Sequence, residues 1–364
     1  MSVLVRKFAE RWCPLVYVAC WFIYFTIIQR CFKFLFIKKI LLDGTLIKFW
    51  KFACSTGRGI GRTASDDLSF FLTRQAEGID ELRNKTSINY FPTIIFAPFF
   101  LPENSVVVIQ DVIPIICANN YSLAKNWLWK FYYPRIARKA IKIITISETS
   151  RNDICEHLHI PKSKIVVVPC YIKKFKVDKN VGSLEFQAPF VLFVGTADKH
   201  KNLEIIFNAL QDNALEKIHF VLVGNKKNID DAIPKDLHDR VHCIGVVPDT
   251  KLTSLLKSAT ALVYPSIYEG FGLPPFEAAL VGCPIICSDI PVLREIWSQN
   301  EVLFANPYSS KEWVDAILST MSKTSENSLR CHNAFVKANK YTGESSRKLL
   351  MRTILDISLS IQTR

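Results

Sequence analysis

The sequence predicts an α/β protein of two domains, each built on a parallel sheet, that face each other across a cleft. Short apolar runs alternate with helix-forming segments in two separate stretches of the chain, and this alternation is typical of parallel sheets. A polar, charged stretch without hydrophobic periodicity, residues 176–188, lies between them and is the expected linker. The length of 364 residues fits two or three domains.

The N-terminal domain is expected over residues 34–175. Its predicted strands are short apolar runs, and they lie within 34–46, 92–97, 106–111, 142–147 and 164–169. A glycine-rich loop leading into a helix is expected over 55–75, and a basic amphipathic helix over 129–140. The segment "ETSRNDICEHLHI" after Ser147 predicts a capped helix.

The C-terminal domain is expected over residues 189–345. Its predicted strands lie at 190–195, 219–224, 241–247, 261–264 and 285–287, with helices over 201–211 and 251–259. The last segment, 346–364, predicts an amphipathic helix with no further strand beside it.

The stretch "PSIYEGFGLPPFEAALVGCPIICSD", residues 265–289, predicts a loop and a short helix between two strands. Pro274 and Pro275 suit the start of a helix, where a missing N–H costs nothing. Gly282 fits the position just past its end, and Pro284 prevents continuation. The helix therefore carries Glu277 in its expected first turn.

This motif has the composition of an anion and hydroxyl site. In open α/β sheets, ligands bind beyond the carboxyl ends of the strands. Gly270 and Gly272 allow backbone N–H groups to approach a ligand closely, and a helix start favours negative charge. Glu269 and Glu277 offer carboxylates to vicinal hydroxyls such as those of a ribose. The alternative is that both are surface charges of a loop and a helix end.

Cysteine usage indicates a reducing compartment. The chain has eleven cysteines, an odd number without a CxxC pair or an accompanying histidine cluster. Cys283 and Cys287 flank a predicted strand and are expected to be small core residues. No small-x-small cleavage site follows the apolar N-terminal run, so no cleavable signal is expected.

The net charge of +13 is concentrated near the N-terminus. Residues 1–58 hold ten Lys and Arg against Glu10 and Asp43, which leaves +8 there. Residues 1–33 interleave this charge with aromatics, and we expect them to associate with an anionic membrane surface. The uncharged run 12–29 is at the lower limit for a span, so an interfacial anchor, a span and a buried segment remain alternatives. Nucleic acid is not expected as a partner, because no recognition motif accompanies the charge.

Three segments carry a resemblance to a known family. The combination of "FVGT…KHKNL", "HFVLVG" and residues 265–290 closely resembles nucleotide-sugar glycosyltransferases of the two-Rossmann GT-B fold. More narrowly, it is similar to the large retaining family four, which builds lipopolysaccharide, capsule and related glycans, and whose two glutamates stand at the spacing of Glu269 and Glu277. The resemblance covers roughly residues 40–350 and is strongest over 190–290.

The resemblance implies roles for the motif residues. Glu277 would bind the donor ribose, and Glu269 would orient the donor sugar. Lys201 would neutralise the diphosphate, although it also fits a solvated lysine at a helix start. The remaining implied donor-binding residues are Gly195, Thr196, Gly270, Phe271, Gly272 and Leu273.

In the N-terminal domain, the resemblance implies that Gly59 and Gly61 form a loop over the phosphates near the acceptor, and that Gln110 and Asp111 lie near the donor sugar. Retaining members are expected to use front-face attack, with the leaving phosphate taking the acceptor's proton. No DxD motif is present, so neither a metal nor another cofactor is predicted, and the nucleotide sugar serves as co-substrate.

The sequence departs from the family pattern at several positions. Gln110 stands where relatives usually have His, and Thr196 stands where many have Arg. His200 replaces an Arg found in a subset, so phosphate binding would depend more on Lys201. Cys170 and Tyr171 replace a usual Asn-Gly.

The function predicted is transfer of a hexose, with mannose slightly favoured by family analogy, to a glycan or glycolipid acceptor. The enzyme is expected in the cytoplasm at the inner face of the cell membrane. A non-catalytic glycosyltransferase-like subunit is the alternative motivated by Gln110 and Thr196, and an epimerase on the same scaffold is a third.

Overall fold

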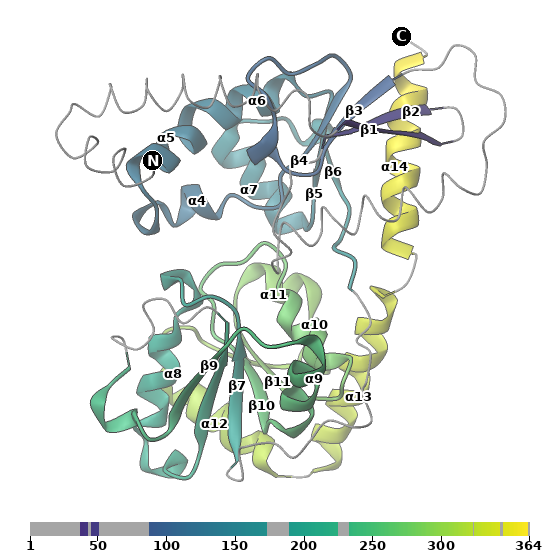
Figure 1. The fold of residues 1–364 in the computed structure, drawn as a ribbon. Helices are drawn as coiled ribbons and strands as arrows, with labels where there is room; N and C mark the ends of the chain where they lie inside the picture. The colour runs from purple at the N-terminus through teal and green to yellow at the C-terminus, as the bar shows by residue number, and fades with distance from the viewer. Residues whose placement is uncertain are drawn as a thin grey trace.

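The computed structural model describes residues 37–42, 45–50, 87–172, 189–224, 233–322, 324–342 and 345–362. It contains two six-stranded sheets, one in each half of the chain, with helices packed around them (Figure 1). Three predicted features lie outside the described residues: the membrane segment 1–33, the glycine-rich loop 55–75 and the linker 176–188.

The first sheet has its strands in chain order, from β1 to β6. The strands are β1 (Ile37–Leu42), β2 (Thr45–Trp50), β3 (Ser87–Phe91), β4 (Ser105–Val108), β5 (Lys142–Thr145) and β6 (Ile165–Val167). All neighbouring pairs from β2 to β6 are parallel, as predicted. The pair β1–β2 is antiparallel, because two residues between them allow only a hairpin.

The predicted strand at 92–97 is wrong. The strand ends at Phe91, and Ile94–Phe96 form a 3-10 turn. Pro92 has no N–H to donate to a sheet, and the side chain of Thr93 accepts a hydrogen bond from the Ile95 N–H at 3.4 Å. Both features favour a turn over an extended run of apolar residues.

The helices of this half lie between β4 and β5 and between β5 and β6. They are α4 (Ile113–Ile116), α5 (Leu123–Trp127), a π-helical turn (Leu128–Tyr132), α6 (Tyr133–Lys139) and α7 (Glu148–Leu158). Ser147 caps α7 by accepting a hydrogen bond from the Ser150 N–H at 3.0 Å, which confirms the predicted capped helix.

The second sheet is entirely parallel, with the order β12-β11-β10-β7-β8-β9. Its strands are β7 (Phe190–Val194), β8 (His219–Val223), β9 (Val241–Gly245), β10 (Ala261–Tyr264), β11 (Ile285–Ser288) and β12 (Leu303–Ala305). Its helices are α8 (Leu203–Leu210), α9 (Asp249–Ser258), α10 (Leu273–Ala279), α11 (Pro291–Ile296), α12 (Ser310–Met321) and α13 (Ser325–Lys340). From β7 the chain builds toward one edge, and from β10 it builds toward the other. The strand order therefore reverses between β7 and β10.

The final helix, α14 (Ser345–Gln362), returns to the first sheet (Figure 1). Its buried residues Leu350, Ile354 and Ile357 join a core with Tyr90 and Val106. The chain passes between the two halves at Ile172 and again near Thr342, and these crossings pair through a hydrogen bond from the Ile172 N–H to the Tyr341 carbonyl at 3.0 Å. The C-terminal segment thus completes the N-terminal core.

Within the described ranges, no helix has both the length and the apolar character needed to cross a bilayer.

The packing of α14 gives a first prediction. Replacing the fully buried Ile354 (0 % exposed) with Ala should lower the free energy of unfolding by about 2–5 kcal/mol, because it leaves a cavity against the first sheet. Leu359→Ala on the same helix is the control, since Leu359 is 60 % exposed and its loss should cost little. Denaturant unfolding of both variants measures the difference, and equal stabilities would contradict the packing.

Candidate functional site

Two loops meet where the strand order of the second sheet reverses. The loop 195–202 follows β7 and the loop 265–272 follows β10, at the carboxyl edge where ligands of open α/β sheets bind. Asn202 donates its side-chain N–H to the Pro265 carbonyl at 3.2 Å, and the Ile267 N–H donates to the His200 carbonyl at 2.9 Å. These bonds fix the two loops to one another.

An ion pair between Lys201 and Glu269 closes this junction. The Lys201 ammonium lies 2.5 Å from Oε1 of Glu269, and the two side chains are only 15 % and 7 % exposed. Burial would raise the pKa of Glu269, but the Lys201 ammonium and the hydroxyls of Ser266 and Tyr264 hold it below its ordinary value. Glu269 is therefore a carboxylate at neutral pH. It is buried beside a cation that still has two further N–H donors.

Gly270 is the point at which the two halves of the chain touch. Its carbonyl accepts hydrogen bonds from the hydroxyls of Ser147 at 2.9 Å and Ser150 at 3.4 Å, both on the first half. A Cβ at position 270 would lie 2.9 Å from the Cβ of Asp111 and 3.3 Å from Ile146. Only glycine allows this approach, which sets Asp111 against the motif loop.

Asp111 is a second perturbed carboxyl group in this cleft. Burial raises its pKa to about 6, the Glu269 charge adds to the rise, and the Ile113 N–H, which donates to Oδ1 at 3.0 Å, opposes it. Near neutral pH the site therefore pairs a firmly ionised Glu269 with a carboxyl group that readily takes a proton.

Further polar contacts join the two halves around Gly270. The Tyr268 hydroxyl donates to Asp153 at 2.5 Å. The carboxylate of Glu295 accepts the Glu148 N–H at 2.7 Å and the Thr149 N–H at 2.8 Å, so α11 caps the N-terminus of α7. No local sequence pattern predicts these contacts, because each links residues more than a hundred positions apart.

Comparison with known proteins identifies the C-terminal part of the chain. Residues 175–337 match a family model described as "Glycosyl transferases group 1". The matched residues span the second sheet and most of α13.

Two of the curated relatives are named as O-antigen chain mannosyltransferases. An O-antigen chain mannosyltransferase of Salmonella typhimurium is 26 % identical over 226 residues, which is 60 % of this chain and 61 % of that protein. O-antigen chain mannosyltransferase B of Escherichia coli is 25 % identical over 266 residues, covering 68 % of this chain and 70 % of that protein. The first alignment thus spans somewhat less than two thirds of the relative's length.

Solved structures share the fold. Anabaena HepE in complex with UDP-glucose matches with a TM-score of 0.59 at 16 % identity, covering 74 % of this chain and 78 % of that one. Sucrose-phosphate synthase from Thermosynechococcus elongatus matches with a TM-score of 0.63 at 16 % identity, covering 85 % and 81 %. The GT-B fold predicted from the sequence is confirmed.

Most predicted site residues of the group 1 domain lie at the junction. Gly195 directly follows β7, and Thr196 is exposed and donates to Asp198 at 2.5 Å. Gly272 has a φ of +92°, in the left-handed region, directly before the partly buried Leu273. The side chain of Phe271 instead lies in the core of the domain, stacked on Phe276 at 5.1 Å.

The predicted position of Glu277 in the first helical turn is wrong. Helix α10 begins at Leu273, and its first turn contains no acidic residue. The left-handed Gly272 allows the helix to start one residue before Pro274, so Glu277 falls in the second turn, 8 % exposed.

In the first half, Gln110 and Asp111 directly follow β4. The Gln110 carbonyl accepts a hydrogen bond from the Thr145 hydroxyl at 3.2 Å. Gly59 and Gly61 lie outside the described residues.

Two cleft residues were missed by the sequence analysis. Tyr121 and Lys125 lie at the start of α5, with the Lys125 ammonium 3.8 Å from the centre of the Tyr121 ring. Burial raises the pKa of Tyr121 to about 12, and the charges of Asp198 and Asp111 add to it. Burial lowers the pKa of Lys125, while the same two carboxylates oppose that shift. The charges of Asp198, in the second half of the chain, and Asp111, in the first half, therefore act on both side chains.

Gly224 was also missed. It ends β8, and a Cβ there would lie 1.7 Å from the Gly195 carbonyl oxygen. The backbones after β7 and β8 thus approach too closely for any side chain. The sequence signal was available, since both apolar strands end in glycine.

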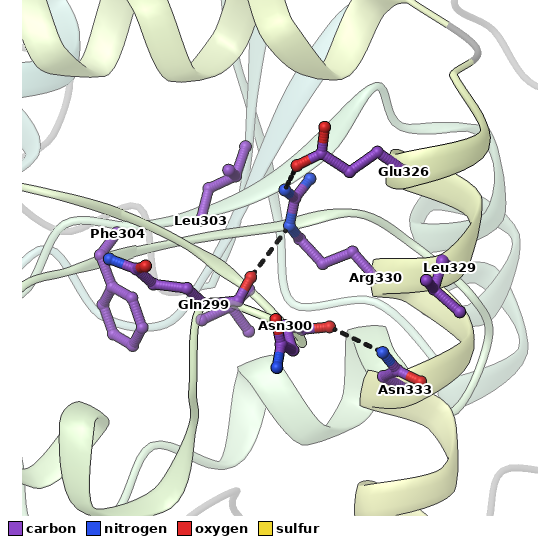
Figure 2. Close-up of a pocket in the computed structure, with 9 residues that line it drawn as sticks. Gln299, Asn300, Leu303, Phe304, Glu326, Leu329, Arg330 and Asn333 are labelled. Atoms are coloured by element: carbon purple, nitrogen blue, oxygen red, sulfur yellow. Dashed lines mark hydrogen bonds and ion pairs between the residues drawn. The ribbon is translucent and has the colours of Figure 1, made fainter.

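A pocket of about 340 Å³ lies elsewhere, between residues 299–304 and α13 (Figure 2). Its Arg330 donates to Glu326 at 2.6 Å and to the Gln299 carbonyl at 3.2 Å, and Asn333 donates to the Asn300 carbonyl at 3.2 Å. The pocket shares no residue with the loop junction. Its polar groups attach α13 to the preceding loop.

The buried pair gives a second prediction. Glu269→Ala should lower the free energy of unfolding by about 3 kcal/mol, because it leaves the Lys201 ammonium buried without a counter-charge. Lys201→Met in the same chain should recover part of that loss, and a double-mutant cycle by denaturant unfolding measures the coupling. The exposed pair Asp289–Arg294 of the same domain is the control, with a coupling below about 1 kcal/mol. Equal couplings in the two cycles would contradict the buried pair.

Asp111 gives a third prediction. Its raised pKa favours the neutral form in the folded state, so its stabilising contribution is full below pH ~4 and is lost as the pH rises through about 6. Asp111→Asn removes this titration. The free energy of unfolding of the variant, relative to that of the native chain, should therefore rise by about 2 kcal/mol between pH 4 and pH 7. Denaturant unfolding across this range measures the difference. A constant difference would show that Asp111 titrates alike in the folded and unfolded chains.

Proposed function

We propose that the protein is a retaining glycosyltransferase that moves a hexose from a nucleoside diphosphate sugar to a hydroxyl of a glycan or lipid-linked acceptor. The observation that carries the proposal is the buried Lys201–Glu269 pair, held at the strand-order reversal of a group 1 domain and facing Asp111. The mannosyltransferase names of the relatives support mannose as the sugar.

The chemistry needs stabilisation of a leaving diphosphate. The bond between the anomeric carbon and the β-phosphate oxygen breaks, a bond to the acceptor oxygen forms on the same face, and the acceptor's proton passes to the departing phosphate. Negative charge then grows on the phosphate, and a preorganised cation with backbone N–H groups is the efficient response. Lys201 has N–H donors beyond the one facing Glu269, and the backbone N–H groups around Gly270 and Gly272 lie in the adjoining loop.

The two motif glutamates would bind hydroxyls. Glu269, ionised and fixed by Lys201, would accept hydrogen bonds from the donor sugar and hold its anomeric carbon toward the cleft. Glu277, in the second turn of α10, would accept bonds from the ribose. We propose that Lys201 takes the charge-balancing role without a metal ion.

Across the cleft, Asp111 would complete the donor-sugar site. Its raised pKa allows it to donate or accept a hydrogen bond near neutral pH. Tyr121 and Lys125 would face the acceptor side, because they come from the first half and lie near both Asp111 and Asp198. The proposed place of action is the cytoplasmic face of the cell membrane, where an acceptor on a lipid carrier would be reached.

Nucleotide binding gives the fourth prediction. In a thermal-shift screen of UDP, GDP, dTDP, CMP and ADP with their common sugars, one nucleotide class should raise the melting temperature. A ligand at a hundred times its dissociation constant adds roughly 2.7 kcal/mol to the stability of the folded state. Glu277→Ala should abolish the shift, whereas Glu326→Ala, in the remote pocket, should preserve it.

A response to no nucleotide would contradict the proposal. The alternative, a non-catalytic glycosyltransferase-like subunit, predicts that Glu269→Ala leaves the biological output intact. It is motivated by Gln110 and by Thr196, whose hydroxyl donates to Asp198. Assay of sugar transfer by Glu269→Gln distinguishes the two, because the active enzyme should lose most of its turnover and the subunit has none to lose.

A further inference from the structure

An exposed apolar stripe runs along the helical segment that starts at the cleft. Helix α5, the π-helical turn and α6 follow one another without a break from Leu123 to Lys139. Leu123, Trp127 and Phe131 are spaced four residues apart along it, and the rings of Trp127 and Phe131 lie 5.8 Å apart. Leu123 is 81 % exposed and Phe131 is 55 % exposed. We call these three residues the exposed stripe.

Basic residues are frequent in the sequence that carries the exposed stripe, and acidic residues are missing from it. Residues 112–147 contain six Lys and Arg and no Asp or Glu. In the parts of the chain that the structure describes, no carboxylate forms an ion pair with any of the six. The Lys130 ammonium lies 5.6 Å from the centre of the Phe131 ring. This concentrated positive charge complements an anionic surface.

The start of the segment lies near the candidate site. Lys125, two residues after Leu123, lies within electrostatic reach of Asp198 and Asp111. In Figure 1, α4 and α5 lie on the side of the first half opposite to α14. A surface placed against α5 would therefore lie near the candidate site and away from α14.

We propose that the exposed stripe and its cations dock the protein onto an anionic lipid bilayer, with the cleft opening at the membrane surface. Leucine and aromatic side chains on one face of a helix, with lysine and arginine beside them, suit the boundary between headgroups and acyl chains. Nucleic acid would use the charge but would leave Leu123 exposed, so the bilayer is the better match. An acceptor held in that bilayer would present its hydroxyl to the cleft, and this last step rests on the proposed glycosyltransferase function.

The test compares two matched pairs of surface substitutions in the full chain. Leu123→Ser with Phe131→Ser removes most of the exposed stripe. Leu329→Ser with Phe335→Ser is the control, because these residues on α13 have the same chemistry and are 59 % and 43 % exposed. Cosedimentation with vesicles of phosphatidylcholine, with and without phosphatidylglycerol, measures partitioning. The stripe variant should partition about tenfold more weakly into the anionic vesicles, and the control should match the native chain.

The charge is tested separately. Lys130→Gln with Arg135→Gln should weaken binding to the anionic vesicles while leaving the weak binding to neutral vesicles unchanged, and added salt should reduce the difference. The proposal is overturned if the stripe variant binds as well as the native chain, which would assign all membrane affinity to other segments. It is equally overturned if the Leu329→Ser with Phe335→Ser control loses as much affinity for the anionic vesicles, or if the native chain binds no vesicles. A stripe variant that loses affinity for RNA but keeps its affinity for vesicles would also overturn it.

Nucleotide binding separates this proposal from the proposed function. The stripe variant should keep the thermal shift with the responding nucleotide sugar, because the exposed stripe lies outside the loop junction. A chain that binds vesicles through the stripe but binds no nucleotide would overturn only the proposed function. A chain that binds nucleotide but not vesicles would overturn only the docking surface.

Discussion

The buried ion pair between Lys201 and Glu269 is the constraint on which the site depends. It lies between the loops after β7 and β10, the two strands at which the sheet order reverses. A carboxylate taken out of water is costly unless a cation and hydrogen-bond donors compensate it. Here the compensation comes from the neighbouring loop and from Tyr264 and Ser266. The same geometry that stabilises Glu269 therefore also fixes the position of the ammonium beside it.

Glycines determine how closely the backbone can gather around that pair. Gly195 and Gly224 allow the ends of β7 and β8 to touch, and Gly272 turns the chain into α10. Gly270 allows the motif loop to meet Asp111 on the other half of the chain. At each of these positions a side chain would hold the neighbouring parts of the structure apart. The result is two neighbouring carboxyl groups with opposite shifts in pKa, because among the described residues Glu269 has a cation in contact and Asp111 has none.

The parts that the sequence predicted are those with a local cause. Apolar runs, most of them ending at glycine or proline, predicted five of the six strands of the second sheet but not the short β12. Ser147 predicted the start of α7. Local cues failed at 92–97, where Pro92 and Thr93 outweighed an apolar run, and at Glu277, where a left-handed Gly272 moved the helix start. Tyr121, Lys125 and Glu295 could not be found this way. Their importance comes from partners far along the chain, and no spacing in the sequence records the packing that brings them together.

The contacts between the two halves of the chain determine how easily the halves can separate. Several are polar: hydroxyls on the Gly270 carbonyl, Tyr268 on Asp153 and Glu295 on the start of α7. Ile146, from the first half, instead packs into the hydrophobic core of the second. Water can replace the polar partners if the halves separate, whereas the apolar surface of Ile146 would then be exposed. The apolar part of the contact therefore carries most of the cost of separation. The crossings at Ile172 and Thr342 are paired with each other and lie outside this set of contacts. The proposed transfer reaction needs a donor to enter and a nucleotide to leave. For that reaction the paired crossings are the natural pivot, and the contacts around Gly270 are the part that would open.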